Sequence, residues 1–459
     1  MSQADLEISV FHRSADDFGV TLRFRHPAAG QDKSASGVLA LDEAALGQVQ
    51  HDATAYGERL AAQLFASPGL RSFLDQTLAV AASQQTPLHL RLFIHPDATA
   101  LHALRWETLR LPGSATPLAT GEWVRFSRYL DSAGWRPTRT VERAALRALV
   151  AVASPDMAGT ALAEVRIDRE LAAARAGLGD IPTVELAGRG QVTLSALLAR
   201  LRDGCDILYL AAHGALVDGE PQILLEREDG GRAWTAGSEL AARLGELASP
   251  PSLVVLVSCQ SAGADGQWLA QDGGALAGLG PRLAAAGVPA VVAMQGNLSM
   301  DTAAAFMPAF LRELRRDGQM ARAMAVARGA VRERGDWWMP VLFARLEDGQ
   351  IWPSSSSVVS PEIQQQDSKP KRIHTPGGSF QMSSSALRAL LMAAFSDEEL
   401  TTLCFDHFRT VYDDFTTGMS KGQKVQRLLE FCSRHQEVQT LLTLVEQANP
   451  TQYQRYLSG

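Results

Sequence analysis

Apolar residues along the middle of the chain gather in short runs, and segments with helical spacing of leucine, alanine and isoleucine separate most of these runs. Strands that alternate with helices are typical of βαβ units, in which a parallel sheet is buried on both faces. The pattern therefore predicts an α/β fold with a mostly parallel sheet flanked by helices. The predicted strands are 146–152, 183–186, 207–211, 253–257, 290–294 and 341–346, and the predicted helices are 167–178, 194–201 and 274–286.

Other segments are predicted to add to this body. Residues 222–227, followed by the turn sequence Glu228-Asp229-Gly230-Gly231, predict a hairpin beside the sheet. Residues 301–315 and 319–334 have the periodicity of two long helices. We expect the first 145 residues to extend the same body rather than to fold alone. Their predicted strands are 6–11, 20–24 and 88–94, and their predicted helix is 55–65.

The composition changes near residue 354. Residues 354–383 contain serine, proline and glycine without apolar periodicity, which predicts a flexible linker. Residues 384–459 predict a small all-α domain, in which Ser396 with Glu399 and Ser420 with Gln423 have the spacing of capping boxes. The predicted organisation is an N-terminal extension at 1–84, a main body at 85–353, the linker at 354–383 and the helical domain at 384–459.

Charge and cysteine usage exclude several classes of function. A formal net charge of −7 argues against broad binding to nucleic acids or to anionic membranes. No apolar run approaches the ~18 residues of a membrane span, and the N-terminus lacks the layout of a signal peptide. The cysteines form no CxxC pair and no Cys/His group, so we predict no metal. The paired glycines are not followed by Lys-Ser/Thr, so no phosphate loop is indicated and we predict no cofactor. Sparse, unpatterned cysteine is typical of a cytoplasmic protein.

Two of the predicted strands end in residues that carry chemistry. The strand 207–211 leads to His213-Gly214, and the strand 253–257 leads to Cys259, which small residues follow. Functional groups of open α/β sheets gather beyond the carboxyl ends of the strands. If the two strands are neighbours, the imidazole can take the thiol proton and create a thiolate nucleophile. Backbone N–H groups of Gly214 and Cys259 could then stabilise an oxyanion, so acyl transfer is the reaction class that this pattern favours.

Each of these signals has a structural alternative. A cysteine after an apolar strand is usually a small buried hydrophobic residue, and a histidine at a strand end is usually a hydrogen-bonded structural residue. Two such strand ends, separated by one hairpin and one helix, are much less common than either alone. Their combination favours a catalytic pair.

The motifs around both residues resemble those of the CHAT family, a caspase-like branch of the clan CD peptidases. The resemblance covers roughly residues 85–353 and implies a caspase-like fold with His213 as base and Cys259 as nucleophile. It further implies that the amides of Gly214 and Cys259 form the oxyanion hole. The segments that carry it are Ala212-His213-Gly214, Ser258-Cys259-Gln260-Ser261-Ala262-Gly263, Leu101-His102-Ala103-Leu104-Arg105-Trp106-Glu107, 283–292 and Trp338-Met339-Pro340-Val341-Leu342-Phe343.

The substrate pocket departs from one pattern among the related enzymes. Metacaspase-like enzymes that cut after basic residues resemble one another in an aspartate two positions before the cysteine, where this chain has Val257. A basic P1 side chain would lack its counter-ion there, so we expect an uncharged P1 residue unless Asp265 or Asp272 supplies the charge. Asp218 is a candidate for orienting His213, and the alternative is a solvated loop residue.

The C-terminal helical segment resembles the effector-associated domains, death-like adaptors of bacterial conflict systems. Leu387, Leu390-Leu391, Phe395-Ser396 and Glu399-Leu400, with Leu428-Leu429 and Asn449-Pro450 later, carry this resemblance. A generic stabilising bundle is the alternative. A domain on a polar tether favours recruitment of a partner, which raises local concentration.

Together the two resemblances imply a cysteine endopeptidase of a prokaryotic immune or cell-death pathway. Its partners would be a protein effector as substrate and another effector-associated-domain protein, with no nucleic acid and no membrane. Two alternatives remain open. One is a catalytically silent scaffold that signals by docking. The other is a flavodoxin-like small-molecule binder, and the lack of a phosphate-binding loop in the sequence argues against it.

Overall fold

The structure is a computed structural model of the 459-residue chain. It describes residues 3–14, 17–26, 32–95, 98–111, 113–129, 141–160, 162, 164–257, 259–260, 275–296, 298–346, 349–352, 384–413, 415, 419, 421–435, 437–450 and 453. The chain divides into two compact units, residues 1–360 and 361–459, and each is described by itself.

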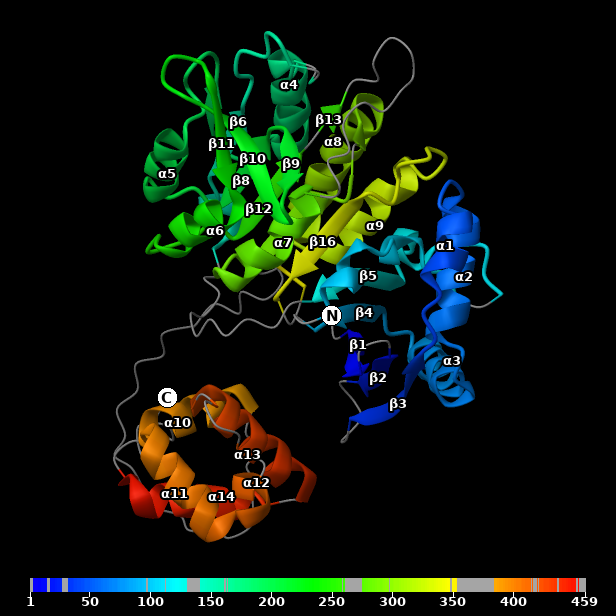
Figure 1. Ribbon diagram of the computed structural model, residues 1–459, viewed down its shortest axis with the longest axis vertical. Helices are drawn as coiled ribbons and strands as arrows, with labels where there is room; N and C mark the ends of the chain where they lie inside the picture. Colours follow the sequence, from blue (N-terminus) through cyan, green and yellow to red (C-terminus); the bar gives the residue numbers. More distant parts are fainter. Residues whose placement is uncertain are drawn as a thin grey trace, which may run out of the picture. The chain divides into compact units, whose positions relative to one another are not determined.

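One large sheet organises the first unit (Figure 1). The described residues form 11 strands in the order β3-β2-β1-β4-β5-β16-β14-β12-β8-β6-β7. The bounds are β1 Ala4–Ser14, β2 Asp17–Arg25, β3 Lys33–Leu39, β4 Leu88–Ile94, β5 Val124–Tyr129, β6 Ala148–Val152, β7 Thr183–Ala187, β8 Ile207–Ala211, β12 Leu253–Val257, β14 Ala290–Met294 and β16 Pro340–Ala344. The mostly parallel sheet confirms the predicted fold class.

The direction of β16 differs from the predicted pattern. The sequence places residues 341–346 among the parallel strands, but β16 runs antiparallel to β14. Two helices in succession, α8 (Met300–Asp317) and α9 (Met320–Ala330), connect these strands. One crossover helix brings the chain back so that the next strand runs parallel to the previous one. A second helix reverses the chain direction again, so the next strand runs antiparallel. The two predicted helices therefore explain a direction that the strand pattern alone does not give.

The N-terminal strands continue the same sheet. β1 pairs in parallel with β4, and β2 and β3 follow as an antiparallel meander. Along β1 the side chains alternate between buried and half-buried, because the core formed with the helices of this region lies on one face of these strands. The helices are α1 (Glu43–Gln48), α2 (Ala53–Leu64) and α3 (Pro68–Ser83).

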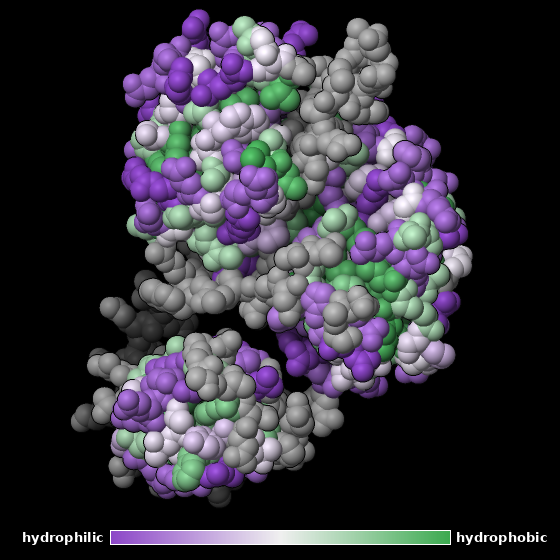
Figure 2. Space-filling view, viewed as in Figure 1, coloured by the Kyte–Doolittle hydropathy of each residue, from purple (hydrophilic) through white to green (hydrophobic). Residues whose placement is uncertain are grey.

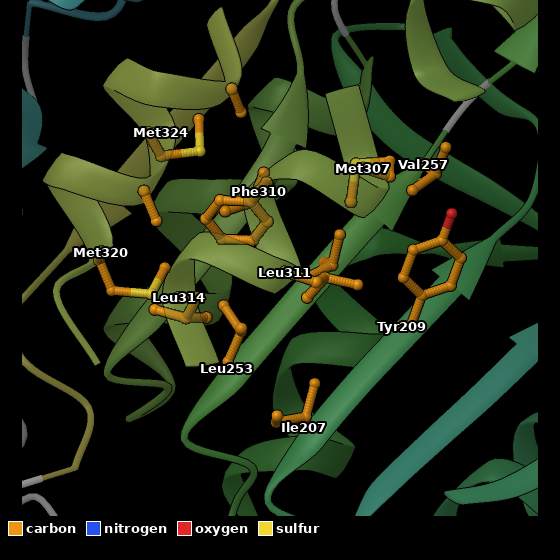
Figure 3. Close-up of a cluster of buried hydrophobic side chains, with 14 of the residues drawn as sticks. Ile207, Tyr209, Leu253, Val257, Met307, Phe310, Leu311, Leu314, Met320 and Met324 are labelled. Atoms are coloured by element: carbon orange, nitrogen blue, oxygen red, sulfur yellow. The ribbon is translucent and has the colours of Figure 1, made fainter. Parts of the chain in front are cut away.

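Helices cover the central strands on both faces. Side chains of α4 (Ile167–Leu178), α8 and α9 form the core on one face, and side chains of α5 (Leu194–Arg202), α6 (Gly237–Gly245) and α7 (Ala275–Ala285) form the core on the other. Figure 3 shows part of the first core, where Tyr209 and Val257 lie near Met307. Burial on both faces explains why the strands read as unbroken apolar runs.

Two small sheets lie beyond the large one. β9 (Gly214–Val217), β10 (Glu220–Glu226) and β11 (Arg232–Ala236) form a three-stranded antiparallel sheet, which confirms the predicted hairpin. β13 (Cys259–Gln260) and β15 (Leu298–Ser299) form a two-stranded parallel sheet. Short 3-10 helices η1 (Thr99–Ala103), η2 (Trp106–Thr108), η3 (Leu118–Thr120) and η4 (Arg143–Ala145) complete the elements of this unit.

The second unit is all-α around its own apolar core, which includes Leu391, Leu400 and Leu428. Its described helices are α10 (Ser384–Ala394), α11 (Asp397–His407), α12 (Arg409–Asp413), α13 (Lys421–His435) and α14 (Val438–Ala448). Ser396 and Glu399 form the predicted capping box of α11. Ser420 lies outside the described residues.

The face shown in Figure 2 is mainly hydrophilic, with hydrophobic patches between the polar side chains. Large apolar side chains that are at least one-third exposed include Trp123, Leu216 and Trp234. No helix in the described part of the chain is long and apolar enough to cross a bilayer.

Candidate active site

His213 and Cys259 follow the carboxyl ends of two neighbouring parallel strands. β8 and β12 pair in a register that sets Ala211 opposite Val257. The Ala212 N–H donates to the Val257 carbonyl oxygen at 3.0 Å, one step beyond the last paired residues. His213 and Cys259 are therefore each two residues beyond a matched pair. Adjacent strands are ~4.8 Å apart, so the backbones of the two residues leave the sheet side by side.

His213 is held between the large sheet and the hairpin sheet. Its carbonyl oxygen accepts the N–H of Leu224 in β10 at 2.8 Å, and Gly214 opens β9 opposite Ile223. The His213 side chain is 2% exposed. The hairpin thus fixes the backbone of the histidine from one side while β8 fixes it from the other.

The backbone at Cys259 is part of a second ladder. In β13, Cys259 pairs with Leu298 and Gln260 with Ser299 of β15, which follows β14. The side chain of Cys259 lies outside the described part of the structure, as do Ser258 and residues 261–274, which include Asp265 and Asp272. For Cys259, the structure therefore describes the position of the backbone.

An aspartate that sequence reasoning missed holds β15 in place. The Asp336 carboxylate accepts the N–H of Ser299 at 2.8 Å and the hydroxyl of Thr302 at 2.6 Å. Ser299 also caps α8 through the N–H of Thr302. Asp336 thus ties the strand beside Cys259 to the start of α8, although 34 to 37 residues separate it from its partners.

The segment that includes η1 and η2 is anchored to the end of β14 by a buried ion pair. Arg128 of β5 donates to both carboxylate oxygens of Glu107, at 3.0 and 2.6 Å, and to the side-chain oxygen of Gln295 at 2.9 Å. Gln295 directly follows β14 and donates to the carbonyl oxygens of Ala103 and Leu104 at 3.0 Å each. Burial, with a smaller contribution from the charge of Arg128, lowers the pKa of His102 in this segment to about 4. The segment that contains Trp106 and Glu107 therefore supports β14, the strand that leads to β15.

Two other candidate residues, Val257 and Asp218, differ in their surroundings. Val257 is fully buried in the core with Tyr209, and a side chain without exposed surface contacts no substrate in this conformation. Asp218 is exposed at the tip of the β9–β10 hairpin with a φ of 51°. Asp218 lies four residues beyond Gly214 along the chain, which is ~13 Å at ~3.3 Å per residue. Asp218 is therefore a solvated turn residue.

The other three cysteines are buried in cores. Burial raises the pKa of the Cys205 thiol, and it raises those of Cys404 and Cys432 to about 12. Thiols with raised pKa values are poor nucleophiles near neutral pH. Among the described residues, no group of three or more histidine, cysteine or acidic side chains could hold a metal ion.

The fold and the strand ends define a caspase-like α/β protein with histidine and cysteine at one edge of a mostly parallel sheet. The CHAT domain family matches residues 54–360, and the chain belongs to this family of caspase-like peptidases. Residues 387–450 match effector-associated domain 7.

Solved structures that match include the Arg-specific cysteine proteinase gingipain R (RgpB), with 11% identity, a TM-score of 0.38 and coverage of 68% of this chain and 76% of that one. A complex of the pro- and mature domains of RgpB from Porphyromonas gingivalis matches with 12% identity, a TM-score of 0.37 and coverage of 68% and 77%. None of the curated proteins matches the chain.

Proposed function

We propose that this chain is a cysteine endopeptidase with Cys259 as nucleophile and His213 as general base. The observation that supports this proposal most directly is the register of β8 and β12, which brings the two residues to equivalent positions on adjacent strands. In this proposal the imidazole accepts the thiol proton, which is the step that acyl transfer by a cysteine needs.

The reaction that these groups support proceeds in two steps. His213 takes the thiol proton of Cys259, and the thiolate attacks the peptide carbonyl carbon, while the amides of Gly214 and Cys259 stabilise the oxyanion. His213 then gives the proton to the leaving nitrogen, the C–N bond breaks and a thioester remains. In the second step His213 takes a proton from a water molecule, whose oxygen attacks the thioester carbonyl carbon. The C–S bond then breaks, His213 gives the proton to the sulfur of Cys259, and the carboxylic acid product leaves.

An uncharged P1 residue remains our prediction for the substrate. Support comes from the sequence at position 257, where this chain has valine in place of the aspartate of basic-specific relatives. Matched fluorogenic peptides with leucine or arginine at P1 test it. Faster turnover of the arginine peptide would contradict it and would direct attention to Asp265 and Asp272.

The C-terminal unit has the role of an adaptor in this proposal. We infer that it recruits another effector-associated-domain protein, and that the body then cleaves a protein effector, such as a pore-forming protein, in a prokaryotic immune or cell-death pathway within the cytoplasm. The match of residues 387–450 to effector-associated domain 7 supports this role.

A silent scaffold is the second candidate function, and the burial of His213 favours it. A histidine that is 2% exposed is not reached by a substrate in this conformation. In the protease proposal, the groups that cover His213 must therefore move aside when a substrate binds. A scaffold requires no such opening.

The decisive experiment compares four full-length chains: wild type, Cys259→Ala, His213→Ala and the control Cys205→Ala. Each is incubated with cell lysate or candidate partner proteins, and new protein N-termini are identified by mass spectrometry. The protease proposal predicts new termini with wild type and Cys205→Ala and none with the other two. Identical termini for wild type and Cys259→Ala would reject it, and partner binding without cleavage by any chain would support the scaffold.

A further inference from the structure

A pocket of about 680 Å³ lies in the first unit between α2, α3 and the segment around residue 110, and it is separate from the sheet edge with His213. Its lining combines two arginines with an apolar wall and a few polar groups. The lining residues used below are Glu58, Ala62, Phe65, Arg71 and Arg110. Its volume falls in the range of small-molecule sites, roughly 300–1,000 Å³.

Arg110 is the unusual member of this lining. It is 7% exposed, and its guanidinium donates to two neutral acceptors, the carbonyl oxygen of Ala115 and, at 3.0 Å, the hydroxyl of Thr54. Its Nε is buried and has no hydrogen-bond partner within the described residues. No carboxylate in the described part of the chain comes within ion-pair distance of it. A buried positive charge is unfavourable unless an anion compensates it.

The neighbouring charges do not supply that anion. Arg71, on the same pocket, forms a partly exposed pair with Asp75 at 3.3 Å, one turn further along α3. Glu58 also lines the pocket, but its side chain is exposed and forms no ion pair with Arg110. The pocket therefore presents two guanidinium groups, one of them buried and uncompensated, beside the buried ring of Phe65.

We propose that this pocket binds a small organic anion through Arg110 and Arg71. A carboxylate or phosphate group matches the planar donors of a guanidinium, and such charge-assisted hydrogen bonds are about twice as strong as neutral ones. The ligand's negative charge compensates the buried guanidinium of Arg110, its acidic oxygens accept from Arg71, and Phe65, in the same lining, contacts the apolar part of the ligand.

Two variants test the site in the full-length chain. Arg110→Gln removes the charge, and Ala62→Glu, on an exposed position of α2, places a competing carboxylate in the pocket. Arg200→Gln is the control, because Arg200 is an exposed arginine on α5 outside this lining. The probes are citrate for the carboxylate class and glycerol phosphate for the phosphate class. Sodium chloride at matched ionic strength separates specific binding from salt effects.

Titration calorimetry and the thermal midpoint are the two measurements. We expect at least one probe to bind wild type and Arg200→Gln and to raise their midpoints, and we expect at least tenfold weaker binding to Arg110→Gln and Ala62→Glu. The probe that binds identifies the acidic group. Absence of binding to wild type, or equal binding to Ala62→Glu, would overturn the proposal. If Arg110→Gln does not fold, Ala62→Glu and Arg71→Gln carry the comparison.

Discussion

Three of the four cysteines have surroundings that make them unreactive, and this gives a test at the scale of single residues. At neutral pH the fraction of thiolate falls as the pKa rises, so Cys205, Cys404 and Cys432 should react slowly with iodoacetamide. We expect Cys259 to be alkylated first in the folded chain, with the other three modified only after denaturation. Peptide mapping after a time course measures this order.

The Cys259→Ala variant is the control for that experiment, since it should lose the fast-reacting position and keep the slow ones. Early modification of Cys205 or Cys404 in folded protein would show that burial does not protect them. Slow modification of Cys259 would argue that its thiol is not activated in the resting chain.

The sequence identifies His213 and Cys259 because each follows an apolar run, which is a local signal. The supports of these residues give no such signal. Arg128 and Gln295 are 167 residues apart, and nothing near either one indicates the other. Asp336 was likewise missed, because an acid next to two tryptophans has no pattern that distinguishes it from a surface residue. Long-range polar pairs therefore require the structure.

At the scale of elements, two helical glycines provide a matched pair of substitutions. A Cβ added to Gly57 in α2 would lie 1.9 Å from the carbonyl oxygen of Thr108, whereas one added to Gly47 in α1 would meet nothing within 4 Å. We expect Gly57→Ala to lower the free energy of unfolding by ~1–3 kcal/mol, because α2 must move away from η2. Gly47→Ala should raise it by up to ~0.5–1 kcal/mol. Urea unfolding curves of both variants measure the difference.

Equal stabilities of the two glycine variants would mean that α2 and η2 do not pack as closely as the structure indicates. The comparison matters for the site because η2 carries Glu107, whose ion pair with Arg128 reaches Gln295 at the end of β14.

Glu220 connects β10 to two helices, and its titration predicts a pH dependence. Its carboxylate pairs with Arg282 of α7 and accepts the N–H of Ser238 in α6 at 3.0 Å. These contacts, chiefly the bond with Arg282, lower the pKa of Glu220 to about 2. A carboxylate with a lowered folded pKa stabilises the fold above its unfolded pKa, near 4.5, and this contribution is lost as the pH falls through about 2. The stability difference between wild type and Glu220→Gln should therefore be constant above about pH 5 and shrink below it.

Urea midpoints of both chains at pH 7 and at pH 3.5 measure this effect, and Glu228→Gln, at an exposed position of the β10–β11 turn, is the control. A difference that does not shrink at the lower pH would mean that the carboxylate is not what stabilises this connection.

The elements themselves could largely be predicted. β8, β12 and β14 match the expected ranges, because strands buried on both faces are apolar throughout and end abruptly in polar residues. The direction of β16 could not be read from its own residues, since the same apolar run fits either direction. The pairing of β13 with β15 was missed because two-residue strands carry no periodicity.

At the scale of the whole molecule, the two units have separate apolar cores. The cores of the first unit contain residues up to Trp352, and the core of the second begins at Leu387. Because each unit has its own core, each can fold alone. Residues 1–360 should therefore fold without the second unit, and their thermal midpoint should be close to that of the same transition in the full chain.

Deletion of residues 384–459 then separates catalysis from recruitment. Because His213, Cys259 and the contacts that support them all belong to the first unit, the shortened chain should keep its turnover of a short peptide. Activity that depends on an effector-associated-domain partner should disappear, since the surface that recruits the partner is gone. Peptide turnover and partner-dependent cleavage, measured on the same two preparations, distinguish these effects. Loss of both activities, with the midpoint of the first unit lowered as well, would instead mean that the helical unit stabilises the body, as a generic bundle would.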